Sequence, residues 1–111
     1  MTVQELINTN LFQLKNAGDD LERDITVPFC CDLLSVAMGQ APSGSVWVTV
    51  MANMNTLAVA SLTDVACVIL AEDAQADEML LTKASVQGIT VFATELSIFD
   101  AALAVYQKLQ P

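Results

Sequence analysis

The feature that most constrains the fold is a long apolar stretch, residues 45–71 (SVWVTVMANMNTLAVASLTDVACVILA), which contains one charged residue, Asp64. A stretch of this length is either a membrane-spanning helix, which needs about 20 mostly apolar residues, or the interior of a soluble domain. Its asparagines and Asp64 would place polar groups deep in hydrocarbon, at a high cost in free energy. No Lys or Arg lies between Arg23 and Lys83 to anchor or orient a span. The sequence therefore favours a soluble core.

The pattern changes along this stretch in the way expected of a βαβ unit. Residues 46–51 (VWVTVM) are β-branched and aromatic, which is typical of a strand buried on both faces of a parallel sheet. Residues 53–64 are richer in Ala and Leu and predict a short helix, which Asn55 can cap with its side-chain oxygen. Residues 66–71 (ACVILA) predict a second buried strand.

The rest of the chain repeats the alternation of strands and helices. Thr2 followed by Glu5 is a capping box that opens a short helix. We expect further strands at 11–15, 24–29 and 89–94, and further helices at 30–39, at 72–88 and from Ser97 onward. Strands that alternate with helices predict the α/β class: one layered domain, residues 1–111, with a mostly parallel sheet flanked by helices.

Single residues indicate where these elements begin, end and pack. Pro28 closes the strand at 24–29 in an edge-type position. Asp32 lies in the first turn of the helix at 30–39, where the helix dipole favours an acid, and Gly39 ends that helix. Gly88 ends the helix at 72–88. The final helix is expected to face the core with one stripe of helical spacing; its residues are Phe99, Ala102, Leu103, Tyr106 and Leu109.

Charged residues are few and mostly acidic, with 13 Asp and Glu against 4 Lys and Arg, a net charge of −9. Nucleic-acid binding depends on clustered Lys and Arg that neutralise phosphates, and basic residues also hold proteins on anionic membranes. We therefore expect no nucleic-acid and no membrane partner. Apolar residues make up 54% of the chain. Because large exposed apolar patches are rare on monomers, we expect a homodimer that hides part of this surface.

The chain offers little to catalysis. It has no histidine, the commonest general base and metal ligand. Cys30, Cys31 and Cys67 are an odd number with two adjacent, which makes a poor disulfide framework. Reduced thiols in a cytoplasmic protein are expected; a redox or metal-binding role for the adjacent pair is the alternative. No GxxxxGK[ST], GxGxxG or GxSxG motif occurs, and MTVQELINTN is not a signal peptide. We expect neither enzymatic activity nor a cofactor.

The residues from Cys31 onward resemble the pattern of DRTGG-domain proteins, which are related to the N-terminal domain of HPr serine kinase. The matching residues are Asp32, Leu33, Leu34 and Ser35 before a helix, Trp47 and Thr49 on a strand, Asn55, the segment 58–62 (AVASL) and the segment 88–102 (GITVFATELSIFDAA). The likeness implies a small α/β domain like those of HPr kinase and some cell-wall ligases. It implies no kinase activity, because the phosphate-binding loop belongs to that kinase's other domain.

The resemblance also implies possible partners. Stand-alone members occur in anaerobic bacteria, sometimes beside hydrogenase genes, and related domains accompany nucleotide-sensing modules and form dimers. This chain departs from the pattern where Glu72 and Asp73 replace the family's Gly-Gly. Met51 and Asn53 stand where many relatives have Gln and His. If those positions contact a ligand, the site in this chain is altered or lost.

Ligands of open α/β sheets bind where strands end and helices begin, and residues 51–55 (MANMN) lie at such a point. Asn53 and Asn55 offer hydrogen-bond donors and acceptors, and backbone N–H groups at a helix start can hold an anion. Asp32 and Ser35 would join this site if the two helix starts share one edge of the sheet. Each of these residues also has a purely structural alternative. Asn55 can serve only as a helix cap, Asn53 only as a turn residue, and Asp32 only as an acid that stabilises the helix start.

Two functions are compatible with these residues. The first is a non-catalytic regulatory module, a homodimer that senses a small anionic or nucleotide ligand. The alternative is a structural subunit that docks its apolar face on a larger enzyme, such as a redox complex of the hydrogenase type. Thr49 is the last candidate for ligand contact, although a hydroxyl within a strand is more typical of the core.

Overall fold

Four of the five strands run parallel and lie in the sheet in chain order. The computed structural model describes all residues, 1–111. The sheet order is β1-β5-β4-β3-β2, and only the β1–β5 pair is antiparallel. The elements are α1 (Val3–Asn8), β1 (Gln13–Asn16), β2 (Pro28–Cys30), α2 (Leu34–Gln40), β3 (Val46–Thr49), α3 (Met54–Thr63), β4 (Cys67–Leu70), α4 (Glu78–Gln87), β5 (Val91–Ala93) and α5 (Ile98–Leu109). The predicted α/β class is confirmed.

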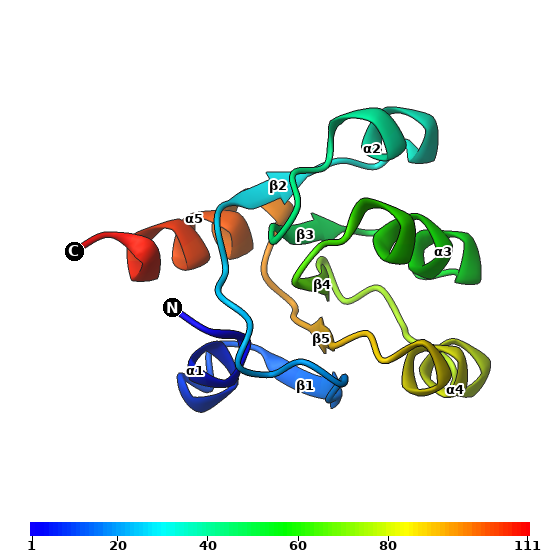
Figure 1. Ribbon diagram of the computed structural model, residues 1–111, viewed down its shortest axis with the longest axis horizontal. Coiled ribbons are helices and arrows are strands. Elements are labelled where there is room, and N and C mark those ends of the chain that lie inside the picture. The colour runs from blue at the N-terminus through cyan, green and yellow to red at the C-terminus, as the bar shows by residue number, and fades with distance from the viewer.

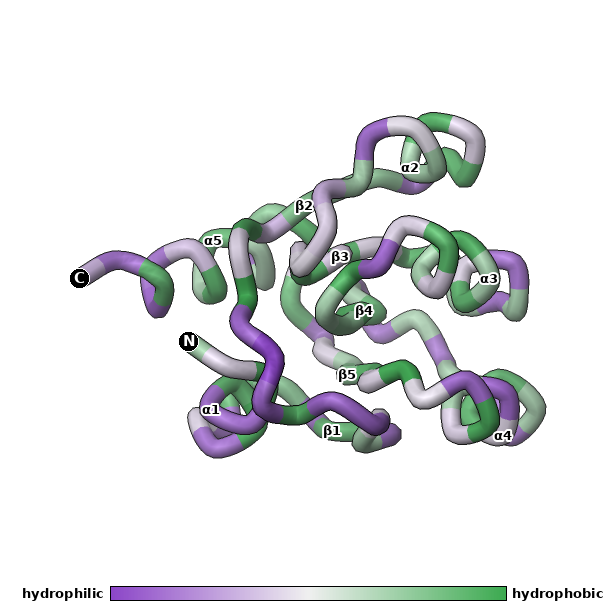
Figure 2. Tube along the Cα trace, in the orientation of Figure 1, coloured by the Kyte–Doolittle hydropathy of each residue, from purple (hydrophilic) through white to green (hydrophobic).

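The helices form two layers, one on each face of the sheet (Figure 1). Helices α2, α3 and α4 each connect one parallel strand to the next, and their buried residues pack in one hydrophobic cluster on the same face. Helices α1 and α5 contribute to a second cluster on the opposite face. Figure 2 shows the apolar strands at the centre of the molecule and a hydrophilic segment between β1 and β2.

The apolar stretch that dominates the sequence is the centre of this fold. Residues 46–71 run through β3, α3 and β4, as predicted, and all residues of both strands are buried. Trp47 packs against the α2–α4 layer and donates its indole N–H to the carbonyl oxygen of Cys31 at 2.9 Å. No helix of the protein combines the length and the apolar character that crossing a membrane requires.

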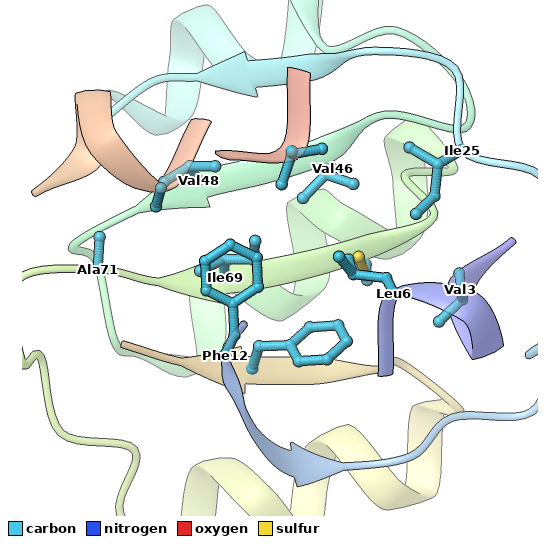
Figure 3. Packing of buried hydrophobic residues seen from close by; sticks show 12 residues of the cluster. Val3, Leu6, Phe12, Ile25, Val46, Val48, Ile69 and Ala71 are labelled. Carbon is cyan, nitrogen blue, oxygen red and sulfur yellow. The ribbon is translucent and has the colours of Figure 1, made fainter. Parts of the chain in front are cut away.

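The second cluster lies between the sheet and the α1–α5 layer. Val46 and Val48 on β3 and Ile69 on β4 share this side with Val3 and Leu6 of α1 (Figure 3). Alternation along a strand explains the division, because neighbouring side chains point to opposite faces. The two clusters thus enclose the sheet from both sides.

Several predicted helix ends are confirmed. The Thr2 hydroxyl accepts a hydrogen bond from the Glu5 N–H, and the Glu5 carboxylate accepts one from the Thr2 N–H, which completes the capping box. Ser97 caps α5. Gly88 follows α4 with φ 70°, in the left-handed conformation that glycine adopts most readily.

Other boundaries differ from the prediction. Strand β2 begins at Pro28 rather than ending there, and it is an edge strand, where the missing N–H of proline is tolerated. Gly39 lies inside α2, which ends one residue later. Helix α4 begins at Glu78 because Asp77 caps it, and residues 72–77 form a loop instead of the first turns of the helix.

The predicted core stripe of α5 is only partly confirmed: Ala102 and Leu109 pack against the core cluster, and the other three residues do not. The residues fully buried against the sheet are Ala101 and Val105. Phe99, Leu103 and Tyr106 lie on the outer side, with 70%, 37% and 51% of their surface exposed. Both faces of α5 are apolar, so hydrophobic spacing alone did not distinguish the inner face from the outer one.

Candidate functional site

Two of the predicted site residues meet at the carboxyl ends of β2 and β3. The Asp32 carboxylate accepts a hydrogen bond from the Thr49 hydroxyl at 2.7 Å and another from the Val50 N–H at 2.9 Å. Asp32 precedes α2 and is not in its first turn, so the predicted helix-dipole role is wrong. Thr49 is fully buried, which confirms its hydroxyl as a core group. Asp32 therefore joins the ends of two neighbouring strands.

The other three predicted residues lie nearby on the surface. Asn53, not Asn55, caps α3, because its side-chain oxygen accepts the Thr56 N–H at 3.2 Å. Asn55 lies in the first turn and is exposed, as is Ser35 in the first turn of α2. The two helix starts do follow neighbouring strands of one sheet edge. None of the five predicted residues lines a cavity, and their ligand-binding role stays a prediction.

A cavity of about 300 Å³ lies further along the same edge of the sheet. Strand β1, the loop after β4 and the end of β5 form its walls. Its lining residues are Gln13, Lys15, Asp73, Ala74, Gln75, Ala76, Ala93, Thr94 and Glu95. We call this the carboxyl-edge cavity.

The topology of the chain explains why a cavity forms there. The chain leaves β4 toward α4 on one face of the sheet, and it leaves neighbouring β5 toward α5 on the opposite face (Figure 1). Where the connections of adjacent parallel strands diverge in this way, a crevice opens outside their carboxyl ends, and this is where open α/β sheets bind ligands. The carboxyl-edge cavity is lined from both diverging loops.

Charged side chains of both signs line this cavity without pairing. Lys15 enters from β1, Asp73 from the loop after β4 and Glu95 from the loop after β5. The protein's one ion pair is elsewhere, between Arg23 and Asp64. The three charges of the cavity are therefore in no ion pair, and Asp73 accepts a hydrogen bond from the neutral amide of Gln75 at 3.1 Å.

The backbone of the loop after β4 is held in an unusual conformation. Glu72 and Asp73 have φ angles of 56° and 60°, in the left-handed region that non-glycine residues rarely adopt. Their N–H groups donate to the carbonyl oxygens of Leu96 and Thr94, at 2.8 and 3.0 Å. These bonds tie the loop after β4 to the loop after β5, so that the two sides of the crevice are fixed relative to each other.

Two further hollows lie on the outer surface, and neither is lined by a strand. One, of about 450 Å³, lies between α3 and α4 and has Met54, Met79 and Val86 in its lining. The other, of about 570 Å³, lies beside α1 and the end of α5. Neither has the relation to strand ends that the carboxyl-edge cavity has.

The opposite edge of the sheet, at the amino ends of the strands, is closed by a cluster of paired groups. The Arg23 guanidinium donates to both carboxylate oxygens of Asp64, at 2.7 and 2.8 Å, and to its carbonyl oxygen at 2.8 Å. The Ser43 hydroxyl donates to the same carboxylate at 2.7 Å. The Arg23 and Ser43 hydrogen bonds lower the pKa of Asp64 to about 2. We call these three residues the amino-edge clamp.

The cysteines are free thiols and lie outside the cavity. Burial raises the pKa of Cys67 to about 12, and burial and the Asp32 charge raise the pKa of Cys30. A raised pKa keeps a thiol protonated and less nucleophilic. No group of three or more Cys, Asp or Glu residues is placed to hold a metal ion.

The carboxyl-edge cavity was not predicted from the sequence. Lys15 and Glu95 come together only because β1 pairs with β5, and strand order is not visible in local patterns. The one available signal was the position of the acids at 72–73 directly after a predicted strand. Comparison of the chain with models of known protein families and with curated proteins returns no match.

Proposed function

We propose that this protein is a cytoplasmic, non-catalytic regulatory domain that binds a small charged molecule in the carboxyl-edge cavity. The observation that supports it is a cavity at the divergence of two strand connections, with Lys15, Asp73 and Glu95 unpaired in its wall. Binding is favoured over catalysis because the lining offers groups that pair with charge and no nucleophile beside a base.

An anionic group of the ligand would pair with Lys15, which is the cation of this cavity. The amides of Gln13 and Gln75 and the Thr94 hydroxyl would supply hydrogen bonds. A volume of about 300 Å³ is at the lower end for small-molecule sites, which favours a small metabolite over a nucleotide.

A thermal-shift screen with small charged metabolites tests this function. A ligand that binds only the folded state stabilises it, and a concentration of about ten times Kd should raise Tm by roughly 5 °C or more. The shift should disappear in Lys15→Met and persist in the matched control Lys83→Met, which changes a lysine outside the cavity. A screen without any shift, or a shift that Lys15→Met leaves intact, would contradict the proposal.

We further propose that the domain is a homodimer that pairs through α5. Phe99, Leu103 and Tyr106 form an exposed apolar stripe along this helix. A second copy that packs its own α5 against this helix would cover the stripe on both chains.

Light scattering tests the dimer. At micromolar concentration the wild-type protein should have about twice the mass of the 11.9 kDa chain, and Phe99→Asp should have the mass of one chain. Met79→Asp, which changes an exposed methionine on α4, should remain a dimer. A wild-type mass of one chain would refute self-association.

The same stripe favours a second candidate function, a subunit that docks on a larger enzyme such as a redox complex. The resemblance to DRTGG-domain proteins, some of whose stand-alone members are encoded beside hydrogenase genes, supports this candidate. A wild-type monomer that forms a defined complex with one purified hydrogenase-type enzyme, lost in Phe99→Asp, would favour docking over the homodimer.

The left-handed conformation of Glu72 and Asp73 is compatible with the proposed family, whose pattern has Gly-Gly there. Glycine adopts positive φ without the steric cost that a Cβ imposes.

A further inference from the structure

We infer that the carboxyl-edge cavity takes a small zwitterion of the amino-acid type, with its carboxylate at Lys15 and its ammonium at the carboxylates of Asp73 and Glu95. This inference rests on the proposed binding function and adds the chemical class of the ligand.

The charges of the lining carry the argument. Lys15 reaches the cavity from β1, and the two carboxylates reach it from loops on the other walls. None of the three is in an ion pair. A simple anion at Lys15 would face two carboxylates of its own sign, and a simple cation at the carboxylates would face Lys15. A molecule that carries both signs pairs with each wall and repels neither.

The neutral groups fit the same class of ligand. The Gln75 amide nitrogen already donates to Asp73, at 3.1 Å to the carboxylate and 2.8 Å to the carbonyl oxygen, so its amide oxygen is left to accept from an ammonium. The Thr94 hydroxyl accepts the Leu96 N–H at 3.2 Å, so its own proton is left to donate to a carboxylate. The amide of Gln13 offers both.

The apolar part of the lining limits the size of the ligand. Ala74, Ala76 and Ala93 are the hydrophobic residues of the cavity, and their methyl groups give a short apolar surface. A short side chain matches this small apolar surface better than a large aromatic one, which would leave most of its apolar area against polar groups. The expected ligands are therefore amino acids with small side chains.

Calorimetric titration of the 111-residue protein with glycine, L-alanine, L-serine and L-threonine tests this inference. We expect at least one of them to bind. Its N-acetyl derivative lacks the cation and its methyl ester lacks the anion, so each should bind at least about tenfold more weakly, the cost of one lost hydrogen-bonded charge. Lys15→Met and Glu95→Gln should weaken binding by a similar factor.

Matched variants outside the cavity serve as controls. Lys83→Met and Glu78→Gln, in the groove between α3 and α4, should bind like the wild-type protein. Equal binding of the zwitterion and both singly charged derivatives would overturn the inference. So would binding of other metabolites that depends on Lys15 while all four amino acids fail, although the proposed function would then stand. If no molecule binds through Lys15, both proposals fail.

Discussion

The two ends of the sheet use the same kinds of residue in opposite ways. At the amino ends of the strands, Arg23, Asp64 and Ser43 satisfy one another through short hydrogen bonds. At the carboxyl ends, Lys15 and the acids of the cavity are left unpaired. An arginine and a carboxylate that pair bidentately form a structural link. Charges that are held apart around a hollow can instead pair with a ligand.

The carboxyl edge itself is divided into a closed half and an open half. Beside β2 and β3, Asp32 links Thr49 and Val50 and leaves no cavity. Beside β4 and β5, the connections diverge to opposite faces and the cavity opens. Topology, rather than the presence of charged or amide side chains, therefore decides where a cavity opens along this edge of the sheet.

The largest effect on stability is expected at the closed half of the carboxyl edge. Asp32→Ala removes the acceptor of the buried Thr49 hydroxyl and should lower the free energy of unfolding by about 1–2 kcal/mol. Asp32→Asn keeps an acceptor oxygen and should recover much of the loss. Urea unfolding measures both values. Equal stability of Asp32→Ala and wild type would show that this half is not held by Asp32.

The next effect is expected at the amino-edge clamp. Arg23→Met should lower the free energy of unfolding by about 1 kcal/mol, the upper end for surface ion pairs, because the Arg23 side chain is only 25% exposed and pairs bidentately with Asp64. Lys15→Met, at the open cavity, should stay within about 0.5 kcal/mol of the wild type. Thermal unfolding of the two variants compares them directly. If Lys15→Met lost more stability than Arg23→Met, the structural role would belong to the carboxyl-edge cavity and not to the amino-edge clamp.

The pH dependence of stability should sharpen this contrast. Because folding lowers the pKa of Asp64 from 3.8 to about 2, its stabilising contribution is full above pH 3.8 and is lost as the pH falls through about 2. Asp64→Asn should therefore be less stable than wild type near pH 5, and the difference should shrink toward pH 2. Urea midpoints at a series of pH values provide the test. A difference that is independent of pH would contradict the ionic clamp.

The smallest effect is expected in the loop beside the cavity. Glu72→Gly removes the steric cost of a positive φ, but the more flexible glycine loses more conformational entropy on folding. The net result should be a rise of about 0.5 kcal/mol in the free energy of unfolding. Glu72→Ala keeps the Cβ and should give no gain. Chemical denaturation distinguishes the two, and a gain in both variants would mean that the backbone conformation is not its cause.

Local patterns predicted most of the fold. The β-branched run at 46–51 correctly predicted a buried strand. Helix ends were correctly predicted from the caps at Thr2 and Ser97 and from Gly88. These signals depend only on neighbouring residues in the sequence. The inner face of α5 was predicted only in part: Ala102 and Leu109 pack against the core, but the fully buried residues are the smaller Ala101 and Val105.

The carboxyl-edge cavity was less accessible to sequence reasoning. The carboxyl edge was predicted as the place for a ligand, but the residues chosen were those of the closed half, at Asp32 and Asn53. Lys15 becomes part of the cavity only through the pairing of β1 with β5, which joins the two ends of the chain. Such a pairing depends on tertiary packing and leaves no local pattern.

We propose that the open half of the carboxyl edge is the binding site. Two-dimensional NMR of the ¹⁵N-labelled protein, titrated with the four small amino acids, tests this proposal residue by residue. We expect saturable shifts of backbone amides at 13–15, 73–76 and 93–95, with little change at Arg23, Ser43 and Asp64. Shifts confined to the amino edge or to α5, or none at all, would contradict it.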